Sequence, residues 1–471
     1  MNTLERMLLQ WGSLDDDFVL DALSQETLTV SSILELREKL EDGSLIQFRN
    51  DYLCLIDGEM RLVNVKFYLA LLLGGFSVLP VTADELESLA FWESASESIV
   101  IHLQDYSYSL KFVKLSKLTT FSKPLTGVRS SGSTSAPRTM LFNIESKIAR
   151  AEVTNKALEC RVGGTLLGSS HLFHSLGQRN VFLALTAKQK LVLPHRIQSF
   201  KSFFDLVEDY KVDYWVPVSS QVNLIFDSNI DQHQLSVVKL KSILFSSADL
   251  NINSLETLKQ IPECNLREIY GIADVGCISM IDLRKYSRDF GVGFPFEHVR
   301  LDVPDISIHD RELTLRVSAR GYCPLASITE SGDDLVLHAI NSDSWFDTGD
   351  LVRIESDPLM GRYLVLKGRS AFSICVGGKV FNPESFEEKI CEKLFISGVL
   401  LIPRADEIMG HLITAYFLRS EVSKVGGLSQ LKKAIKELLP RELVPRRIET
   451  LESFRYLPNG KLDRRSYMDQ I

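Results

Sequence analysis

The chain has 471 residues, of which 45% are hydrophobic and 24% are charged, and its formal net charge is −8. This length predicts two or more domains, and the composition is that of an ordinary globular protein, which excludes an intrinsically disordered chain. An acidic surface does not attract nucleic acid or an anionic membrane, so we expect neither as a partner. The same charge is also what keeps a globular protein in solution.

The cysteines and the apolar segments indicate a cytoplasmic protein. Seven cysteines are present and none forms a CxxC pair, which is typical of a reducing compartment and argues against a disulfide framework or a zinc site. The first five residues do not resemble a signal peptide. The most apolar run, 67–80, contains Gly74 and Gly75 and is shorter than the roughly 20 residues of a membrane span. We predict a buried helix over 66–73 and a buried strand over 76–79.

The stretch from about 66 to 370 alternates between strand and helix patterns. The apolar runs 98–103, 181–185 and 190–193 predict strands, and the spacing of apolar residues in 203–207 predicts a helix. Alternation of this kind predicts an α/β fold with partly parallel sheets.

The pattern changes after Gly361 to that of a small α+β domain. After a short strand over 364–366, Asn382 and Pro383 predict the start of a helix. A second amphipathic helix ends before Pro440. We place the boundary at about Arg369, which gives a large domain over 1–368 and a small domain over 369–471. The apolar faces of the two predicted helices are formed by Phe386, Ile390 and Leu394, and by Leu431, Ile435 and Leu438.

A loop rich in small hydroxyl residues precedes Arg138. Residues of this kind around a glycine expose backbone N–H groups, against which a phosphate group fits, and Arg138 adds positive charge. The loop is not the GxxxxGK[ST] loop of P-loop NTPases, and on composition alone a surface loop remains an alternative. The candidate phosphate ligands are Ser130, Ser131, Gly132, Ser133 and Thr134.

This loop resembles the phosphate-binding loop of the acyl-adenylate-forming superfamily, which includes acyl-CoA synthetases, aryl-acid ligases, nonribosomal adenylation domains and luciferase. The usual pattern is [ST]SG[ST][ST]GxPK, and this chain departs from it at Ser135 and Arg138. Further resemblances follow in the family's order along 66–465, and the segment before the loop is shorter than usual. The resemblance implies a large domain of stacked α/β subdomains with a mobile C-terminal lid.

Three further segments resemble parts of the family, and two of them resemble segments beside its acyl group. Residues 67–80 resemble the helix, glycine turn and strand that precede the phosphate loop, 170–177 resemble a loop that carries a histidine, and 245–250 resemble a strand end beside adenine and the acyl group. A core or surface histidine is the alternative for this histidine. The resemblance implies a substrate pocket formed by His174, Ser246, Ser247, Gly271 and Ile272.

Two motifs resemble the family's adenine and ribose contacts. The stretch 270–274 resembles YGxTE, which implies that Tyr270 stacks on adenine and that Asp274, one methylene shorter than the usual glutamate, binds Mg²⁺. Taken alone, this stretch reads as a turn at a helix end. The stretch 345–351 resembles the TGDL motif, which implies that Asp350 accepts hydrogen bonds from the ribose hydroxyls; taken alone, it reads as an ordinary turn.

The end of the chain resembles the family's hinge and its reactive lysine. Arg369 matches the Arg that contacts ribose or phosphate, and Ala371 stands where Asp or Lys is usual. Gly377 and Gly378 resemble the loop that lines the tunnel for the thiol arm. Lys461, after a Pro-Asn-Gly turn, resembles the catalytic lysine that bridges the substrate carboxylate and the α-phosphate; a surface lysine is the alternative.

The resemblance implies ATP-dependent conversion of a carboxylic acid to acyl-AMP, with pyrophosphate release, followed by transfer to the thiol of CoA or of a phosphopantetheinyl carrier protein. ATP and Mg²⁺ are the implied cofactors. Residues 170–177 contain no carboxylate that would hold an α-amino group, so we expect a fatty or aryl acid. The alternative is a degenerate relative that binds nucleotide or acyl groups without turnover, because Ser135, Ala273, Asp274 and Ala371 depart from the family pattern.

Overall fold

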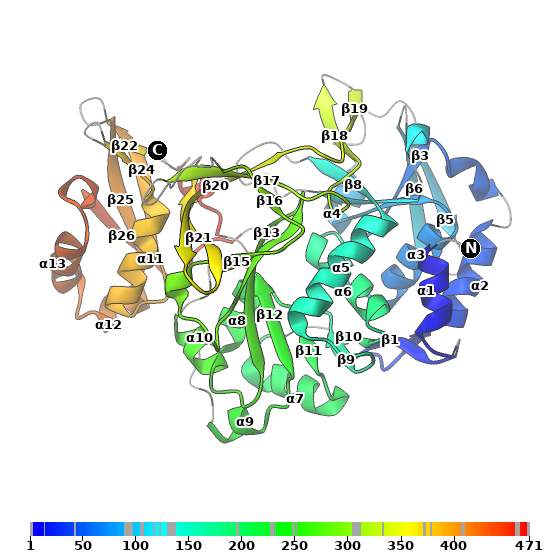
Figure 1. Ribbon diagram of the computed structural model, residues 1–471, viewed down its shortest axis with the longest axis horizontal. Helices are drawn as coiled ribbons and strands as arrows, with labels where there is room; N and C mark the ends of the chain where they lie inside the picture. Colours follow the sequence, from blue (N-terminus) through cyan, green and yellow to red (C-terminus); the bar gives the residue numbers. More distant parts are fainter. Residues whose placement is uncertain are drawn as a thin grey trace.

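The fold combines two large mixed sheets, a four-stranded sheet and a C-terminal unit at one end of the molecule (Figure 1). The computed structural model describes residues 3–13, 15–41, 44–88, 98–103, 108–115, 118–121, 124–129, 138–194, 197–226, 230, 232–246, 250, 252–303, 312–331, 334–370, 374–376, 379–406, 410–456 and 462–468.

The first large sheet has nine strands in the order β15-β14-β13-β12-β11-β9-β10-β1-β2. The run from β13 to β1 is parallel, whereas β2, β14 and β15 are antiparallel to their neighbours. A parallel sheet needs cover on both faces, which explains why its strands read as continuous apolar runs. The strands are β1 (Asp17–Asp21), β2 (Thr27–Thr29), β9 (Thr165–Leu167), β10 (Lys190–Leu193), β11 (Tyr214–Trp215), β12 (Ser242–Ser246), β13 (Asn265–Ile272), β14 (Gly276–Asp282) and β15 (Phe294–Pro295).

The second large sheet has eight strands in the order β19-β18-β8-β7-β4-β3-β6-β5. Only the pairs β3–β4 and β4–β7 are parallel among its described strand pairs. The strands are β3 (Tyr52–Asp57), β4 (Ser77–Val81), β5 (Ser98–Leu103), β6 (Tyr108–Lys114), β7 (Leu125–Arg129), β8 (Thr139–Asn143), β18 (Ala326–Ser331) and β19 (Asp334–Ala339).

The main core lies between these two sheets and is filled by helices from both halves of the large domain. Helix α3 (Leu62–Leu73) is apolar on nearly every side, and its residues 67–72 are fully buried, as expected for a helix enclosed by protein. Helices α5 (Ile144–Leu158) and α6 (Ser175–Thr186) pack together beside it (Figure 1). The first helices of the chain are α1 (Thr3–Trp11), α2 (Val30–Glu41) and α4 (Ala83–Ser88), with the 3₁₀ turns Ser44–Phe48 and Leu118–Thr120.

A second core covers the other face of the nine-stranded sheet. Phe203, Trp215 and Phe226 are fully buried and pack edge to face or at a tilt, arrangements that aromatic rings favour. The covering helices are α7 (Phe200–Tyr210), α8 (Ser219–Phe226), α9 (Gln232–Val237) and α10 (Ile252–Leu258), and a 3₁₀ turn spans Arg288–Phe290.

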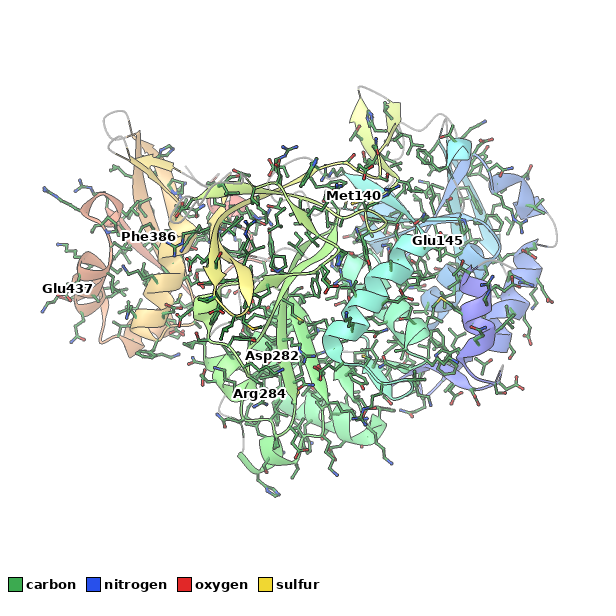
Figure 2. The ribbon with its side chains drawn as sticks, viewed as in Figure 1. Met140, Glu145, Asp282, Arg284, Phe386 and Glu437 are labelled. Atoms are coloured by element: carbon green, nitrogen blue, oxygen red, sulfur yellow. The ribbon has the colours of Figure 1, made fainter. Side chains whose placement is uncertain are left out.

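The four-stranded sheet joins the large sheets to the C-terminal unit, which we define as residues 382–468. The unit has its own apolar core, on which Phe386 packs, while Glu437 lies on the exposed side of its helix (Figure 2). The strands of the small sheets are β16 (Arg300–Leu301), β17 (Leu313–Ser318), β20 (Phe346–Asp357), β21 (Gly361–Arg369), β22 (Ile374–Val376) and β23 (Lys379–Phe381). The C-terminal unit contains α11 (Pro383–Leu394), β24 (Val399–Asp406), β25 (Gly410–Leu418), α12 (Arg419–Lys424), α13 (Leu428–Leu438), a 3₁₀ turn (Arg441–Leu443), β26 (Arg447–Leu451) and α14 (Arg465–Met468).

Most expected elements are present, and one expectation is wrong. The strands over 98–103, 190–193 and 364–366, the helix over 203–207, and the helix and strand within 66–79 all form. Asn382 caps α11 by accepting a hydrogen bond from the amide of Glu384. The run 181–185, however, is helical and belongs to α6. Its residues are all buried, so no polar face reveals the helical period in the sequence.

The first 65 residues are an integral part of the large domain. They supply β1 and β2 at one edge of the nine-stranded sheet and β3 in the middle of the eight-stranded sheet. The domain boundary at Arg369 remains a prediction. Within the part of the chain that the structure describes, no helix is long and apolar enough to cross a membrane.

Candidate active site

The predicted phosphate loop connects two paired strands. Arg129, the last residue of β7, lies opposite Thr139, the first residue of β8. Residues 130–137 themselves, with five of the predicted phosphate ligands, lie outside the described residues. Arg138, the last residue of the loop, forms an ion pair with the carboxylate of Asp274.

Asp274 lies in the turn between β13 and β14, and hydrogen bonds from Arg150 stabilise this turn. The Arg150 guanidinium donates to the carbonyl of Ala273 (2.9 Å) and to that of Asp274 (2.5 Å). Gly271 packs so closely that an added Cβ would lie 2.1 Å from the carbonyl oxygen of Gly276, so this position needs glycine. Burial raises the pKa of the Asp274 carboxyl, although Arg138 opposes the shift.

The stretch 270–274 is thus the end of a strand and a hairpin turn rather than a turn at a helix end. Tyr270 is buried on β13, and its hydroxyl donates to Oδ2 of Asp350 at 2.5 Å. Burial, with Asp350 next in importance, raises the pKa of Tyr270 well above its usual range. The hydroxyl therefore stays protonated and can act as a donor. Ile272, the last residue of β13, is half-buried and packs against the core beneath the four-stranded sheet.

Asp350 and Arg369 face each other across β20 and β21. The two residues are paired in the antiparallel ladder, and Nε of Arg369 lies 2.9 Å from Oδ1 of Asp350. Nη1 of Arg369 also donates to the carbonyl of Thr348 at 2.9 Å. Thr-Gly-Asp lies within β20 rather than in an ordinary turn. Within it Gly349 has φ +70, a conformation that favours glycine. Asp350 thus receives one donor from each of two sheets.

The structure brings three of the predicted pocket residues close to this cluster, because Gly271 and Ile272 directly follow Tyr270 on β13. Ser246 ends β12 and is paired with Ile269 on β13, directly before Tyr270. His174 precedes α6 and contacts the Phe173 ring edge to face, with ring centroids 4.4 Å apart. No contact described by the structure joins His174 to Tyr270, Asp350 or Arg369. Ser247, Gly377 and Gly378 lie outside the described residues.

Lys461 also lies outside the described residues, but the segment on either side of it is described. Tyr456 and Leu462, on either side of it, form an antiparallel bridge. Arg464, three positions after Lys461, binds Glu384 and Glu387 on α11. The base of the segment that carries Lys461 is therefore attached to the first turn of this helix.

Two groups of buried polar residues escaped the sequence prediction. Lys147 is fully buried on α5 and donates to Oε1 of Gln178 on α6 at 2.8 Å. Gln178 in turn donates to the carbonyls of Gly127, on the strand before the phosphate loop, and Leu172, in the predicted acyl loop. Burial, with Arg150 next, lowers the pKa of Lys147 well below its usual range. A lone lysine on a helix gives no sequence signal of this kind, because its burial depends on tertiary packing.

The second group is formed by Glu384, Glu387 and Arg464. Here a sequence signal was available, since the two glutamates are three positions apart just after Asn382-Pro383 and therefore face the same way on the predicted helix. The partner of both carboxylates is Arg464, which is 77 positions from Glu387. The local sequence pattern cannot predict a contact at this separation.

One protein carboxylate, such as that of Asp274, is enough to bind the Mg²⁺ of a magnesium–nucleotide complex. Mg²⁺ is usually held by one or two carboxylates together with substrate phosphates and water. Among the described residues no group of three or more His, Cys, Asp or Glu side chains forms a metal cage. Asp274, at the hairpin turn that contacts the last residue of the phosphate loop, is a suitable donor for such a shared site.

Comparisons with known proteins relate the chain to one group of enzymes. The sequence model of the family described as AMP-binding enzyme matches residues 124–311. VraA of Staphylococcus epidermidis, provisionally named a long chain fatty acid-CoA ligase, is 23% identical over 346 residues, which are 73% of this chain and 70% of VraA. The D-alanine--D-alanyl carrier protein ligase of Staphylococcus aureus is 27% identical over 129 residues, but the match spans only 27% of this chain and 25% of that ligase.

A solved structure shares the whole fold. ATP-bound MatB from Rhodopseudomonas palustris superposes with a TM-score of 0.76 at 14% identity, over 100% of this chain and 99% of MatB. At this identity the likeness shows the fold alone. The α/β fold expected from the sequence is confirmed.

Proposed function

We propose that this chain is a member of the acyl-adenylate-forming superfamily and an AMP-forming ligase, which activates a fatty or aryl acid and transfers it to a thiol. The cluster of Tyr270, Asp350 and Arg369 carries the proposal. These three residues come from separate motifs, and the hydroxyl and the guanidinium both converge on one carboxylate. A carboxylate held by fixed donors is a pre-organised acceptor for ribose hydroxyls.

In the first half-reaction, an oxygen of the substrate carboxylate attacks the α-phosphorus of ATP. The bond from this phosphorus to the bridging oxygen breaks, and pyrophosphate leaves with the electron pair. The protein supplies no nucleophile, so catalysis depends on positioning and on charge. The loop over 130–134 and Arg138 hold the phosphates, Tyr270 supports adenine, and Lys461 lies between the substrate carboxylate and the α-phosphate. Mg²⁺ held at Asp274 supplies neutralisation of the triphosphate charge.

In the second half-reaction, a thiol attacks the carbonyl carbon of acyl-AMP. The carbon–oxygen bond to the phosphate breaks, AMP leaves, and the thiol loses its proton as the thioester forms. The C-terminal unit rotates between the two steps, which replaces Lys461 by the loop with Gly377 and Gly378. Rotation of a small domain about a few residues is an established way to switch sites.

The acceptor is CoA or the phosphopantetheine arm of a carrier protein. The name of VraA includes CoA, and the name of the Staphylococcus aureus ligase includes a carrier protein. The two relatives therefore name both kinds of acceptor. For the acid, we propose a group without an α-amino anchor, because residues 170–177 contain no carboxylate. His174, Ser246, Ser247, Gly271 and Ile272 line the pocket in this proposal. The polar serines favour a hydroxylated aryl acid.

Lys461→Ala provides the direct test of the assignment. Wild-type protein is assayed for acid-dependent ATP–pyrophosphate exchange with benzoate, 4-hydroxybenzoate, octanoate and palmitate. We expect the Lys461→Ala variant to lose at least about a hundredfold in exchange, because an electrostatic contact made in the transition state is removed. Lys433→Ala, an exposed lysine on α13, is the matched control and keeps the wild-type rate. Exchange near wild type in Lys461→Ala would refute the role of this lysine.

A second candidate function is a relative that binds nucleotide without turnover. The ion pair between Arg138 and Asp274 favours it, because this arginine occupies the carboxylate that is to bind Mg²⁺. The same acid panel separates the two functions. Bound ATP without exchange on any acid, extended to amino acids, supports the second candidate, whereas exchange with any acid excludes it.

A further inference from the structure

The first turn of α11 binds the backbone of Arg369 on both sides. Oε2 of Glu384 accepts a hydrogen bond from the Arg369 amide at 2.5 Å, and Nδ2 of Asn382 donates to the Arg369 carbonyl at 2.7 Å. Gly368 has φ +108, and an added Cβ would lie 2.3 Å from Oδ1 of Asn382. The end of β21 is therefore fitted closely to the helix start, and a larger residue at position 368 is excluded.

The side chain of Arg369 binds β20, whereas its amide and carbonyl groups bind the C-terminal unit. Its guanidinium binds Asp350 and the carbonyl of Thr348, both on β20. Arg369 is thus fastened to the candidate ribose site by its side chain and to the C-terminal unit by its amide and carbonyl. Any rotation of the C-terminal unit against β20 must break one of these two sets of contacts or be absorbed at Gly368.

Glu384 also binds the end of the chain. Its second oxygen, Oε1, lies 3.1 Å from Nε of Arg464. The terminal nitrogens of Arg464 bind Glu387, with Nη1 2.9 Å from Oε1. Glu387 is itself buried and accepts a hydrogen bond from the Leu401 amide at 2.6 Å. The Arg464 guanidinium is therefore fixed by two carboxylates of one helix.

Glu384 consequently stands between the candidate ribose site and the segment that carries Lys461. Lys461 precedes Arg464 by three residues, and three residues span at most about 11 Å of chain. Wherever Arg464 is fastened, Lys461 is carried with it. The described contacts lead from Arg464 through Glu384 and Arg369 to Asp350.

We propose that Glu384 is a positioning residue: it joins Arg464 to the Arg369 amide and so fixes the C-terminal unit, whose sequence includes the proposed catalytic Lys461, against the candidate ribose site. This inference rests on the proposed function of Lys461. The contact between Glu384 and Arg369 belongs to the arrangement used for adenylation and is released before thiol transfer. Glu384 touches neither nucleotide nor acid, and it acts through Arg464.

A carboxylate suits this position because both of its oxygens accept hydrogen bonds. One oxygen faces a backbone amide and the other faces a guanidinium, and hydrogen bonds to charged groups are the stronger kind. In Glu384→Gln one of the two acceptors is replaced by an NH₂ donor, so either the amide or Arg464 loses its partner. Glu384→Asp is too short by one methylene to reach both.

The test compares the two half-reactions in Glu384→Gln. Adenylation is followed by pyrophosphate exchange with the most active acid of the panel above, and transfer is followed by mixing chemically prepared acyl-adenylate of that acid with CoA. We expect kcat of adenylation to fall about tenfold to a hundredfold, as for a displaced catalytic group, while KM for ATP and the transfer rate stay within about twofold. Glu392→Gln, exposed on the same helix, is the control and leaves both half-reactions unchanged. Equal losses in both half-reactions, or a Glu384→Gln variant that behaves like Glu392→Gln, overturn the proposal.

A second measurement does not depend on activity. Hydrogen–deuterium exchange of the peptide over 361–370 should be faster in Glu384→Gln than in the wild type or in Glu392→Gln, because the Arg369 amide loses its acceptor. Arg464→Lys, which cannot bind two carboxylates in the same way, should show the same selective loss of adenylation if Glu384→Gln fails to fold. Wild-type protein without exchange on any acid contradicts the proposed function, whereas unchanged amide exchange in Glu384→Gln contradicts the fastening itself.

Discussion

Two carboxylates of the candidate site, Asp350 and Asp274, are buried to a similar extent, but their negative charges have different kinds of partner. Asp350 is 6% exposed and Asp274 is 8% exposed. Asp350 accepts from the Tyr270 hydroxyl and is paired with Arg369. Asp274 is paired with Arg138, whose side chain is 46% exposed and follows directly on the predicted phosphate loop. Burial remains the main influence on Asp274 and raises the pKa of its carboxyl.

The difference separates a fixed acceptor from a carboxylate with a removable partner. The donors to Asp350 lie on strands of two sheets, so the carboxylate is held whether or not a ligand is bound. Arg138 is half in water and can turn away at little cost, because exposed ion pairs contribute little. The first arrangement suits recognition of ribose, and the second suits a site in which metal and phosphate replace an arginine. The following predictions test this contrast in the order of the expected loss of stability.

Asp350→Ala should have the largest effect. It leaves the Arg369 guanidinium and the buried Tyr270 hydroxyl without their partner, which lowers the free energy of unfolding by about 3 kcal/mol, the lower end for breaking a buried pair. Adenylation should fall at least about a hundredfold. Urea unfolding and pyrophosphate exchange measure the two effects.

The matched control for Asp350→Ala is Asp302→Ala. Asp302 pairs with Arg316, and the two side chains are 45% and 50% exposed. We expect a loss below about 1 kcal/mol there. Equal losses in the two variants would contradict the view that Asp350 is a fixed, buried acceptor.

Tyr270→Phe should have the next largest effect on stability. It removes the hydroxyl that donates to Asp350 but keeps the aromatic ring. A hydrogen bond to a charged group contributes about 1.5–3 kcal/mol, so the free energy of unfolding should fall by about 2 kcal/mol. KM for ATP should rise only a few fold, because the ring remains to stack on adenine. A large rise in KM with unchanged stability would mean that the hydroxyl contacts the nucleotide instead.

Asp274→Asn should change stability by less than about 1 kcal/mol, because Arg138 is half exposed and can be solvated. Its effect should lie in the metal requirement, with the Mg²⁺ concentration for half-maximal exchange raised about tenfold. Titration of exchange with MgCl₂ measures this change. Asp302→Ala again serves as the control and leaves the requirement unchanged. An unaltered Mg²⁺ requirement in Asp274→Asn would remove Asp274 from the metal site.

The smallest effect should be a pH dependence. The pKa of Asp274 is raised from 3.8 in the folded protein, so between 3.8 and the raised value the folded state binds more protons than the unfolded state. Stability from this group is therefore lost as pH rises through that window. The wild type should lose stability relative to Asp274→Asn between pH 4 and pH 7, measured by urea unfolding at both values. The opposite sign would mean that Arg138, rather than burial, dominates.

The sequence predicted the order of motifs because each motif depends on local chemistry. A glycine that must adopt positive φ at 349, a proline that begins α11 and an apolar strand before each turn are local requirements. The strand predicted over 181–185 was wrong, because a fully buried helix and a fully buried strand have the same apolar pattern. The secondary structure around Tyr270 was also open, because the five residues 270–274 do not indicate whether a helix or a strand precedes the turn.

What the sequence alone determined is the α/β fold and the choice of Tyr270, Asp350 and Arg369 as candidate site residues. What only the tertiary structure decided is how they are joined. Tyr270 and Asp350 are 80 positions apart, and Glu387 and Arg464 are 77 apart. Local pattern specifies which residue types an element presents, whereas the partner of a buried charge depends on which elements pack together. The burial of Lys147, the pairing of Arg138 with Asp274 and the two contacts of Glu384 follow from that packing.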